Sequence, residues 1–176
     1  MAEAAGGARR GAPVGHRYQM RQRMFAIGDD FFIEDEQGRR AFRVDGKALR
    51  VRSTLKFEDA GGTELYKIQE RLARVRDSMT IERADGGVAA KVHNALLTPL
   101  RDRWTIDVPG GADMKTQGNI VHHEYRIEQG GMPVATVSKK WFRVRDSYGV
   151  EIAPGQDDAL ILAITVVIDM MAHQGR

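Results

Sequence analysis

The sequence predicts a mainly β protein with one helix, in which a closed antiparallel barrel of about twelve strands surrounds a hydrophobic C-terminal helix. Three observations support this prediction. Turn signals recur at short intervals, apolar residues alternate between them, and the last long segment is apolar on every side. The chain has 176 residues, of which 42% are hydrophobic and 29% charged, a composition suited to one soluble domain with one core.

The N-terminal segment differs from the rest of the chain. Residues 1–17 are rich in Gly, Ala and Arg, so we expect a disordered basic arm there and a single barrel domain over residues 18–173. The arm lacks the apolar stretch of a secretory signal, and no part of the chain reaches the roughly 20 apolar residues of a spanning helix. We therefore expect a cytoplasmic protein without a transmembrane segment.

Short strands are expected between the turns, because alternating apolar side chains bury one face of each strand. Glycine adopts positive φ at low cost, so Gly- and Asp-rich clusters mark the hairpin turns. These clusters lie at 28–30, 35–38, 45–46, 59–62, 85–87, 109–111 and 129–131. The alternating positions are Leu49/Val51, Leu55/Phe57, Tyr66/Ile68, Met79/Ile81, Val88/Ala90/Val92, Trp104/Ile106/Val108, Val121/His123/Tyr125/Ile127, Phe142/Val144 and Tyr148/Val150/Ile152.

The sequence also contains an internal repeat. RVRDSMTIE at 74–82 and RVRDSYGVE at 143–151 begin with the same five residues, and RDRWTID at 101–107 is a looser third copy. A repeated supersecondary unit is typical of a barrel built from similar hairpins.

The last element is expected to be a helix over residues 159–172. Asp157 and Asp158 precede it and can cap its free N–H groups. Fourteen residues at about 1.5 Å each span roughly 21 Å, which is about the height of a small barrel. Since the helix has no polar face, we expect it to fill the barrel interior with residues that include Leu160, Leu162, Ile164, Val167, Ile168 and Asp169.

Asp169 interrupts this apolar helix, and a buried carboxylate needs a partner. We expect Asp169 to lie near the barrel rim, where it is hydrated or paired with an arginine. The alternative is a polar site at the end of the lumen.

Four stretches carry a family resemblance: FAIGDDFFIEDEQG at 25–38, FRVDGKAL at 42–49, VATVSKKWFRVRDSYGVEI at 134–152 and DDALILAITVVIDMM at 157–171. They resemble the LURP-one-related proteins of the tubby C-terminal-like superfamily, which also includes the phospholipid scramblases. The resemblance extends from about Tyr18 to Met171 and implies a twelve-stranded barrel around a central helix. It implies no particular biochemical activity.

Two properties of the wider superfamily do not transfer residue by residue. Scramblases carry an acidic calcium-binding stretch before the last helix, but the nearest segment here, 145–149, holds one acid, Asp146, where a hard cation needs several. Tubby domains bind phosphoinositide head groups through basic surface residues, which have no one-to-one match here. Lipid binding therefore transfers only by analogy.

His122, His123 and Glu124 form the most suggestive titratable cluster. On a strand, His122 and Glu124 share one face, so they are weak candidates for two metal ligands. A metal site needs a third ligand, and the chain has no cysteine. We therefore favour a solvated face with His123 as a satisfied inward histidine, and we expect no metal, no cofactor and no catalytic residue.

A basic stretch with one aromatic residue lies between the last two expected strands. Lys139, Lys140, Trp141, Arg143 and Arg145 could contact anionic head groups, with Trp141 at the interface. On strand alternation, Trp141, Arg143 and Arg145 share the outer face. The alternative is an ordinary solvated strand.

These patterns favour a non-enzymatic binding or scaffold module that meets an anionic lipid surface or a protein partner on its outer surface, because a filled lumen leaves little room for substrate. The alternative is a small-ligand carrier or enzyme with a pocket between helix and barrel wall and His122, Glu124 or Asp169 at its mouth.

The excess positive charge is concentrated at the N-terminal end. Residues 1–23 hold five arginines and one acid, a net charge of +4, so the remainder carries −1 of the total +3. Because the folded body is close to neutral, we do not expect it to bind nucleic acid.

Overall fold

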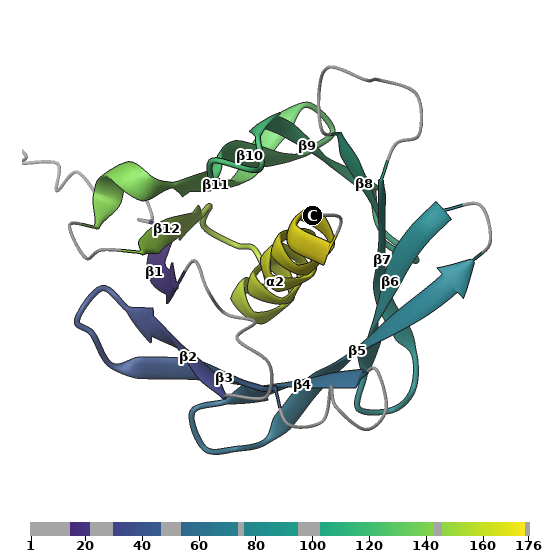
Figure 1. Cartoon of the computed structure of the whole chain (residues 1–176), viewed down its shortest axis with the longest axis horizontal. Coiled ribbons are helices and arrows are strands. Elements are labelled where there is room, and N and C mark those ends of the chain that lie inside the picture. Colours follow the sequence, from purple (N-terminus) through teal and green to yellow (C-terminus); the bar gives the residue numbers. More distant parts are fainter. Residues whose placement is uncertain are drawn as a thin grey trace, which may run out of the picture.

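Twelve antiparallel strands form one closed barrel around a C-terminal helix in the computed structural model (Figure 1). The structure describes residues 15–21, 30–46, 54–73, 76–94, 103–142 and 146–174. The strands are β1 (His16–Arg21), β2 (Phe31–Asp35), β3 (Arg40–Asp45), β4 (Thr54–Asp59), β5 (Glu64–Ala73), β6 (Arg76–Arg83), β7 (Val88–Asn94), β8 (Trp104–Asp107), β9 (Met114–Asn119), β10 (Glu124–Gln129), β11 (Met132–Ser138) and β12 (Ser147–Ile152). Among the described residues, the helices are the short 3-10 helix η1 (Lys139–Trp141) and the long helix α2 (Asp158–Gln174).

The strands follow chain order around the barrel, and the first strand closes it. β1 lies between β12 and β2, with six residue pairs toward β12, from His16–Ile152 to Arg21–Ser147. Toward β2 it has two pairs, Tyr18–Asp35 and Gln19–Glu34. The barrel is therefore closed by pairing between residues at opposite ends of the chain.

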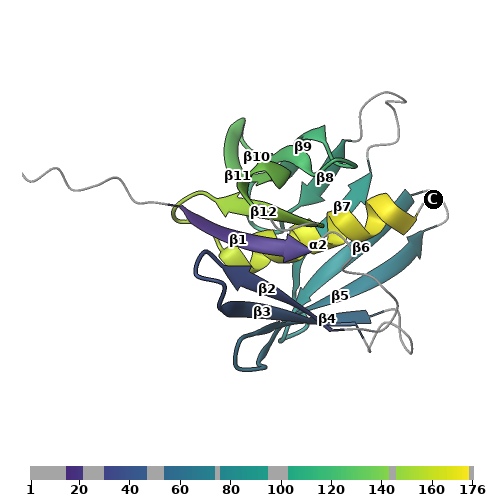
Figure 2. The ribbon, with the colours of Figure 1, turned by 60° about the vertical axis from the view of Figure 1, so that its left-hand side comes forward.

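Helix α2 occupies the barrel interior, as two views of the ribbon show (Figures 1 and 2). Every residue from Ile161 to Met170 is buried, and Leu160 is half-buried. Asp157 caps the helix, since its carboxylate accepts a hydrogen bond of 3.0 Å from the backbone N–H of Leu160. The predicted fold class, a barrel filled by its own apolar helix, is confirmed.

The inner faces of successive strands pack around α2. Phe57 of β4, Ile68 of β5, Ile81 of β6, Val92 of β7 and Ile106 of β8 are all buried. Burial of each such side chain contributes about 1.5–3 kcal/mol relative to exposure, so these contacts favour an interior without a hollow lumen.

Strand alternation was a wrong guide in three places. Residues 120–123 form a turn, so Val121 and His123 precede β10. Residues 139–141 form η1, so Trp141 does not lie on a strand as expected. Val88 is exposed because the register between β6 and β7 shifts by one residue beside Ile81 and turns it outward.

Some expected elements lie outside the described residues, namely those at Leu49, Val51 and Val144. Strand β9 was not expected, because only Met114 and Thr116 of its side chains face the core. β1 begins at His16, so His16 and Arg17 belong to the barrel and not to the expected arm. Residues 1–14 of that arm lie outside the described residues.

The two clear copies of the repeat coincide with β6 and β12. Their equivalent serines, Ser78 and Ser147, are both buried. The copies differ in the element that precedes each strand. β6 follows strand β5 and pairs with it along its length, whereas β12 follows the 3-10 helix η1. The repeat therefore marks two similar strands within one barrel.

Candidate functional site

A buried polar cluster joins the C-terminal half of α2 to the barrel wall. His123 Nε2 lies 2.7 Å from Asp169 Oδ1, and both side chains are 3% exposed. Tyr148 of β12 donates a hydrogen bond of 3.3 Å to Asp169 Oδ2, and its ring stacks on His123 with centroids 4.2 Å apart. Asp169 is thus buried, and its carboxylate contacts a histidine and a tyrosine, which corrects the expectation of a hydrated side chain at the rim.

The turn before β10 positions His123 in this cluster. Its backbone has φ of 53° and its N–H donates to Ile120 O at 3.0 Å, so the side chain turns inward while His122 stays exposed. A left-handed backbone is uncommon for any residue other than glycine. The inward, satisfied histidine was predicted, but its partner on α2 was not.

Burial in this cluster raises the pKa of Tyr148 and of Tyr125 well above the ordinary tyrosine value, and the charge of Asp169 adds to that effect. Both phenols therefore stay protonated under ordinary conditions. The cluster fixes the helix in the barrel and lies beneath the wall, away from solvent.

Carboxylates also anchor the other end of α2. Tyr66 donates to Asp157 Oδ2 at 3.0 Å, and Tyr18 donates to Asp158 Oδ2 at 2.7 Å. His16 Nδ1 lies 2.6 Å from the same Asp158 oxygen. Partial burial and the neighbouring Asp157 raise the pKa of Tyr66 to about 12. Both ends of the helix are thus attached to the wall by polar contacts.

The candidate metal pair is not assembled. His122 contacts Asn119, with its ring Nδ1 3.0 Å from Asn119 Oδ1. The Glu124 carboxylate instead accepts hydrogen bonds from the Ser138 hydroxyl at 3.0 Å and from the Lys139 backbone at 3.1 Å. Across the described part of the chain, no group of three or more His, Asp or Glu side chains is placed to hold a metal ion.

The basic stretch forms a corner on the outside of β12. We call Lys139, Lys140 and Trp141 the basic corner; Arg143 and Arg145 lie outside the described residues. The guanidinium of Arg17 lies 4.9 Å from the centre of the Trp141 ring and also pairs with Glu151, its Nε donating over 3.1 Å. Trp141 is therefore half-buried between Arg17 and the sheet, whereas a strand would have left it fully outward.

Gly149 of β12 makes room for this corner. A Cβ at Gly149 would lie 2.8 Å from ring atoms of both Trp141 and Phe142. The corner thus rests directly on backbone, which no local pattern in the sequence reveals.

Substitution of alanine for Gly149 is expected to displace the Trp141 ring and to destabilise the protein by about 1–3 kcal/mol, because 2.8 Å is shorter than van der Waals contact. In a Trp104→Phe background, where Trp141 is the remaining tryptophan, its fluorescence should shift to longer wavelength. An unchanged spectrum and an unchanged urea midpoint would contradict this packing. Gly61→Ala is the control for glycine replacement, because Gly61 lies outside the left-handed region and a Cβ there would meet only a side-chain oxygen of Asp59, at 3.3 Å.

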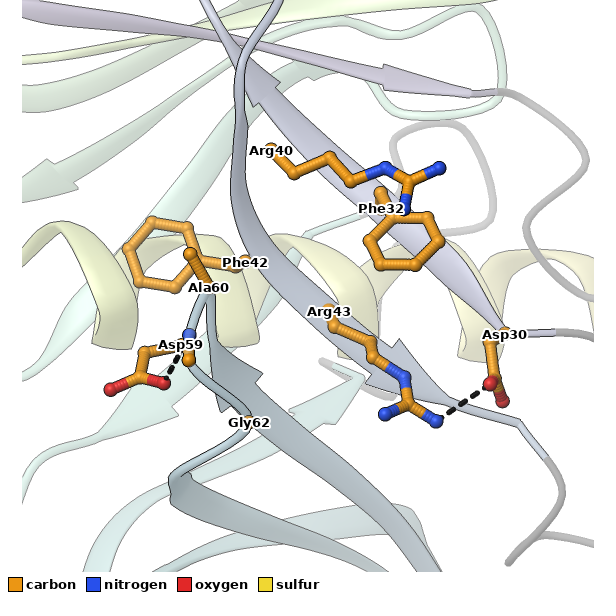
Figure 3. Close-up of a pocket in the computed structure, with 9 residues that line it drawn as sticks. Asp30, Phe32, Arg40, Phe42, Arg43, Asp59, Ala60 and Gly62 are labelled. Atoms are coloured by element: carbon orange, nitrogen blue, oxygen red, sulfur yellow. Dashed lines mark hydrogen bonds and ion pairs between the residues drawn. The ribbon is translucent and has the colours of Figure 1, made fainter.

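Two surface pockets lie elsewhere on the barrel. One, of about 310 Å³, is lined by Asp30, Phe32, Arg40, Phe42, Arg43 and the turn 59–62 (Figure 3). The other, of about 240 Å³, is lined by Gly15, His16, Arg17, Tyr18, Asp35, Glu36, Gln37 and Arg39. Neither is lined by residues of α2, by His122 or by Glu124. No sequence pattern predicts either pocket, because each is lined by segments that lie apart along the chain.

The architecture defines a class of protein: a closed antiparallel barrel with an apolar C-terminal helix in its interior. Within that class, the sequence profile of the LURP-one-related family matches residues 16–169, and the chain belongs to that family, whose fold is tubby-like. The family resemblance of the sequence is thereby confirmed.

Two relatives illustrate the match. The chain is 27% identical over 154 residues to the uncharacterised protein YxjI of Bacillus subtilis (strain 168), which covers 88% of this chain and 92% of that protein. A protein from Arabidopsis thaliana solved by X-ray crystallography has a TM-score of 0.70 and 17% identity, over 92% of this chain and 94% of the other. The second similarity shows the fold alone.

The family match establishes the fold and does not by itself assign an activity to the chain. Among the described residues, no helix combines the length and the apolar character that crossing a membrane requires.

Proposed function

We propose that this protein is a non-enzymatic binding module that attaches to anionic lipid surfaces through its basic corner. The observation that carries the proposal is the occupied interior: ten consecutive buried residues of α2, Ile161–Met170, take the space that a barrel could otherwise offer to a ligand. Recognition then falls to the outer surface.

The chemistry of the basic corner suits a head-group layer. Lys140 is exposed and Lys139 half-exposed, and no carboxylate pairs with either ammonium group within the described part of the chain. Trp141 lies between Arg17 and β12, so its amphipathic ring is held at the surface. Two free cations beside a fixed indole are typical of a site at the boundary between head groups and water.

The test is co-sedimentation of the full chain with phosphatidylcholine vesicles, with and without phosphatidylserine. Binding should require the anionic lipid, and Lys139→Gln with Lys140→Gln should weaken it about 30-fold. The estimate follows from about 1 kcal/mol for each lysine near an anionic surface. High salt should abolish the interaction.

The matched control removes two other exposed lysines, Lys91 of β7 and Lys115 of β9, with the same change in net charge. If both double variants lose binding equally, the attraction belongs to overall charge and the proposed corner is wrong. If the chain binds anionic vesicles no more strongly than neutral ones, recognition of an anionic lipid surface is excluded. A protein partner then becomes the interpretation.

A chain that begins at Gly15 removes the arginines of the arm and keeps β1 intact, because Arg17 is part of the barrel. This chain should still distinguish the two double variants. Loss of that difference would assign the binding to residues 1–14.

A further inference from the structure

One guanidinium on the barrel surface is held in place by an aromatic ring and not by a carboxylate of the described residues. Arg40, the exposed first residue of β3, places its guanidinium carbon 3.8 Å from the centre of the Phe32 ring on β2 (Figure 3). Within the residues that the structure describes, no carboxylate pairs with it. By contrast, the adjacent Arg39 pairs with Asp35 at 2.7 Å.

Arg40 borders the pocket of about 310 Å³, whose opposite side is the turn of residues 59–62. Gly62 in that turn leaves open space, since a Cβ there would meet no atom within 4 Å. Phe32 and Phe42 add apolar surface. The pocket therefore combines an unpaired guanidinium, aromatic walls and room for a small molecule.

The acids around the pocket are engaged. Asp30 lies 2.7 Å from Arg43, and Glu58 lies 3.3 Å from it; their side chains are 19% and 12% exposed. Asp59 accepts hydrogen bonds of 2.9 Å from the backbone of Gly61 and of Thr63, and the backbone bonds lower its pKa. The charges of Asp30 and Glu58 are thus paired with Arg43, whereas Asp59 keeps its negative charge with its oxygen turned to the backbone of its own turn. The exposed positive charge at the pocket is that of Arg40.

Stacking on an aromatic ring holds a guanidinium plane in one orientation and leaves its edge N–H groups free. That fork matches the two oxygens of a carboxylate or phosphate. We propose that this pocket binds a small ligand through an oxyanion, a carboxylate or a phosphate monoester, held by Arg40 with the apolar part of the ligand against Phe32 or Phe42. This site is separate from the basic corner and does not depend on the function proposed for it.

The experiment is a titration of the full chain, followed by amide chemical shifts, with phenyl phosphate, benzoate and inorganic phosphate as probes. Phenyl phosphate or benzoate should shift the amides of Phe32, Arg40 and the turn 59–62. Arg40→Gln should weaken this binding about tenfold or more, because it removes a charge-assisted bidentate contact. Phe32→Leu should weaken it as well, because the guanidinium loses its stacking partner.

Arg39→Gln is the matched control. Arg39 is an exposed arginine of the same hairpin, but its guanidinium is already paired with Asp35. Equal loss with Arg39→Gln and Arg40→Gln would overturn the proposal, as would the absence of shifts at the pocket with every probe. Thermal unfolding of Arg40→Gln should match that of the parent, which separates loss of binding from loss of fold.

Vesicles that contain phosphatidic acid distinguish the source of the oxyanion. Binding that depends on Arg40 but not on Lys139 and Lys140 would assign the phosphate to a lipid head group. Binding of the soluble probes without such vesicle binding would assign the site to a free metabolite. Vesicle binding that is insensitive to Arg40, together with no soluble binding, would exclude this pocket.

Discussion

Replacement of Asp169 by leucine is expected to lower the free energy of unfolding by about 3–5 kcal/mol. The change removes one partner of a buried pair and leaves His123 Nε2 and the Tyr148 hydroxyl facing an apolar side chain inside the barrel. Urea unfolding followed by circular dichroism measures the effect. A loss below about 1 kcal/mol would contradict the role assigned to this cluster.

A double-mutant cycle isolates the pair. Asp169→Leu combined with His123→Leu should cost clearly less than the sum of the two single changes, because neither group is then left buried without the other. Leucine is strained at the φ of 53° of residue 123, but that strain occurs in the single and the double variant and cancels in the cycle. Met170→Leu is the control from the same buried helix and should cost less than about 1.5 kcal/mol.

The second large effect is expected in alkaline solution. The chain has four tyrosines, and in the folded protein the pKa of each is raised: that of Tyr66 to about 12, and those of Tyr18, Tyr125 and Tyr148 well above the ordinary tyrosine value. Burial is the main cause, and the neighbouring carboxylates Asp157, Asp158 and Asp169 add to it. No tyrosine should therefore ionise near pH 10 while the barrel is intact.

The sign follows from proton linkage. In the unfolded chain the tyrosines titrate near pH 10, so the stability they contribute is complete below pH 10 and is lost as the pH rises through the folded values. Each buried tyrosine that stays protonated above pH 10 lowers the stability by about 1.4 kcal/mol per pH unit. Tyr18 and Tyr66 contribute less than this, since both are partly exposed.

Absorbance at 295 nm and circular dichroism, recorded on the same samples from pH 8 to 13, test this expectation. The phenolate signal should stay flat through pH 10 and then rise together with unfolding. A gradual rise centred on pH 10 with an intact dichroism spectrum would show that the tyrosines are accessible and would contradict their place in the anchors of α2.

The fold was predictable because its two determining signals are local. The absence of a polar face along Leu160–Ile168 required that this helix be enclosed, and hairpin turns with alternating strands supplied the enclosure. The capping role of Asp157 was equally local and is confirmed. The prediction of the buried strand face failed where the pairing register shifts by one residue. The shift between β6 and β7 leaves Val88 exposed.

The polar features were less predictable because they join residues far apart in the sequence. His123 meets Asp169 only because the turn at 120–123 adopts a left-handed backbone at that residue. Trp141 rests on Gly149 because η1 interrupts the expected strand. The Arg40 pocket combines two hairpins, and neither hairpin alone carries a recognisable motif.

The closure of the barrel by β1 has a consequence for synthesis of the protein. β1 leaves the ribosome before the other strands of the barrel, yet its main partner β12 and the helix that fills the interior are made after all of them. A nascent chain therefore holds eleven strands whose apolar faces have neither the closing partner nor the interior helix until β12 and α2 have been synthesised. Such a chain is expected to need protection by chaperones during elongation, and deletion of β12 and α2 should expose the strands to aggregation rather than leave a smaller stable barrel.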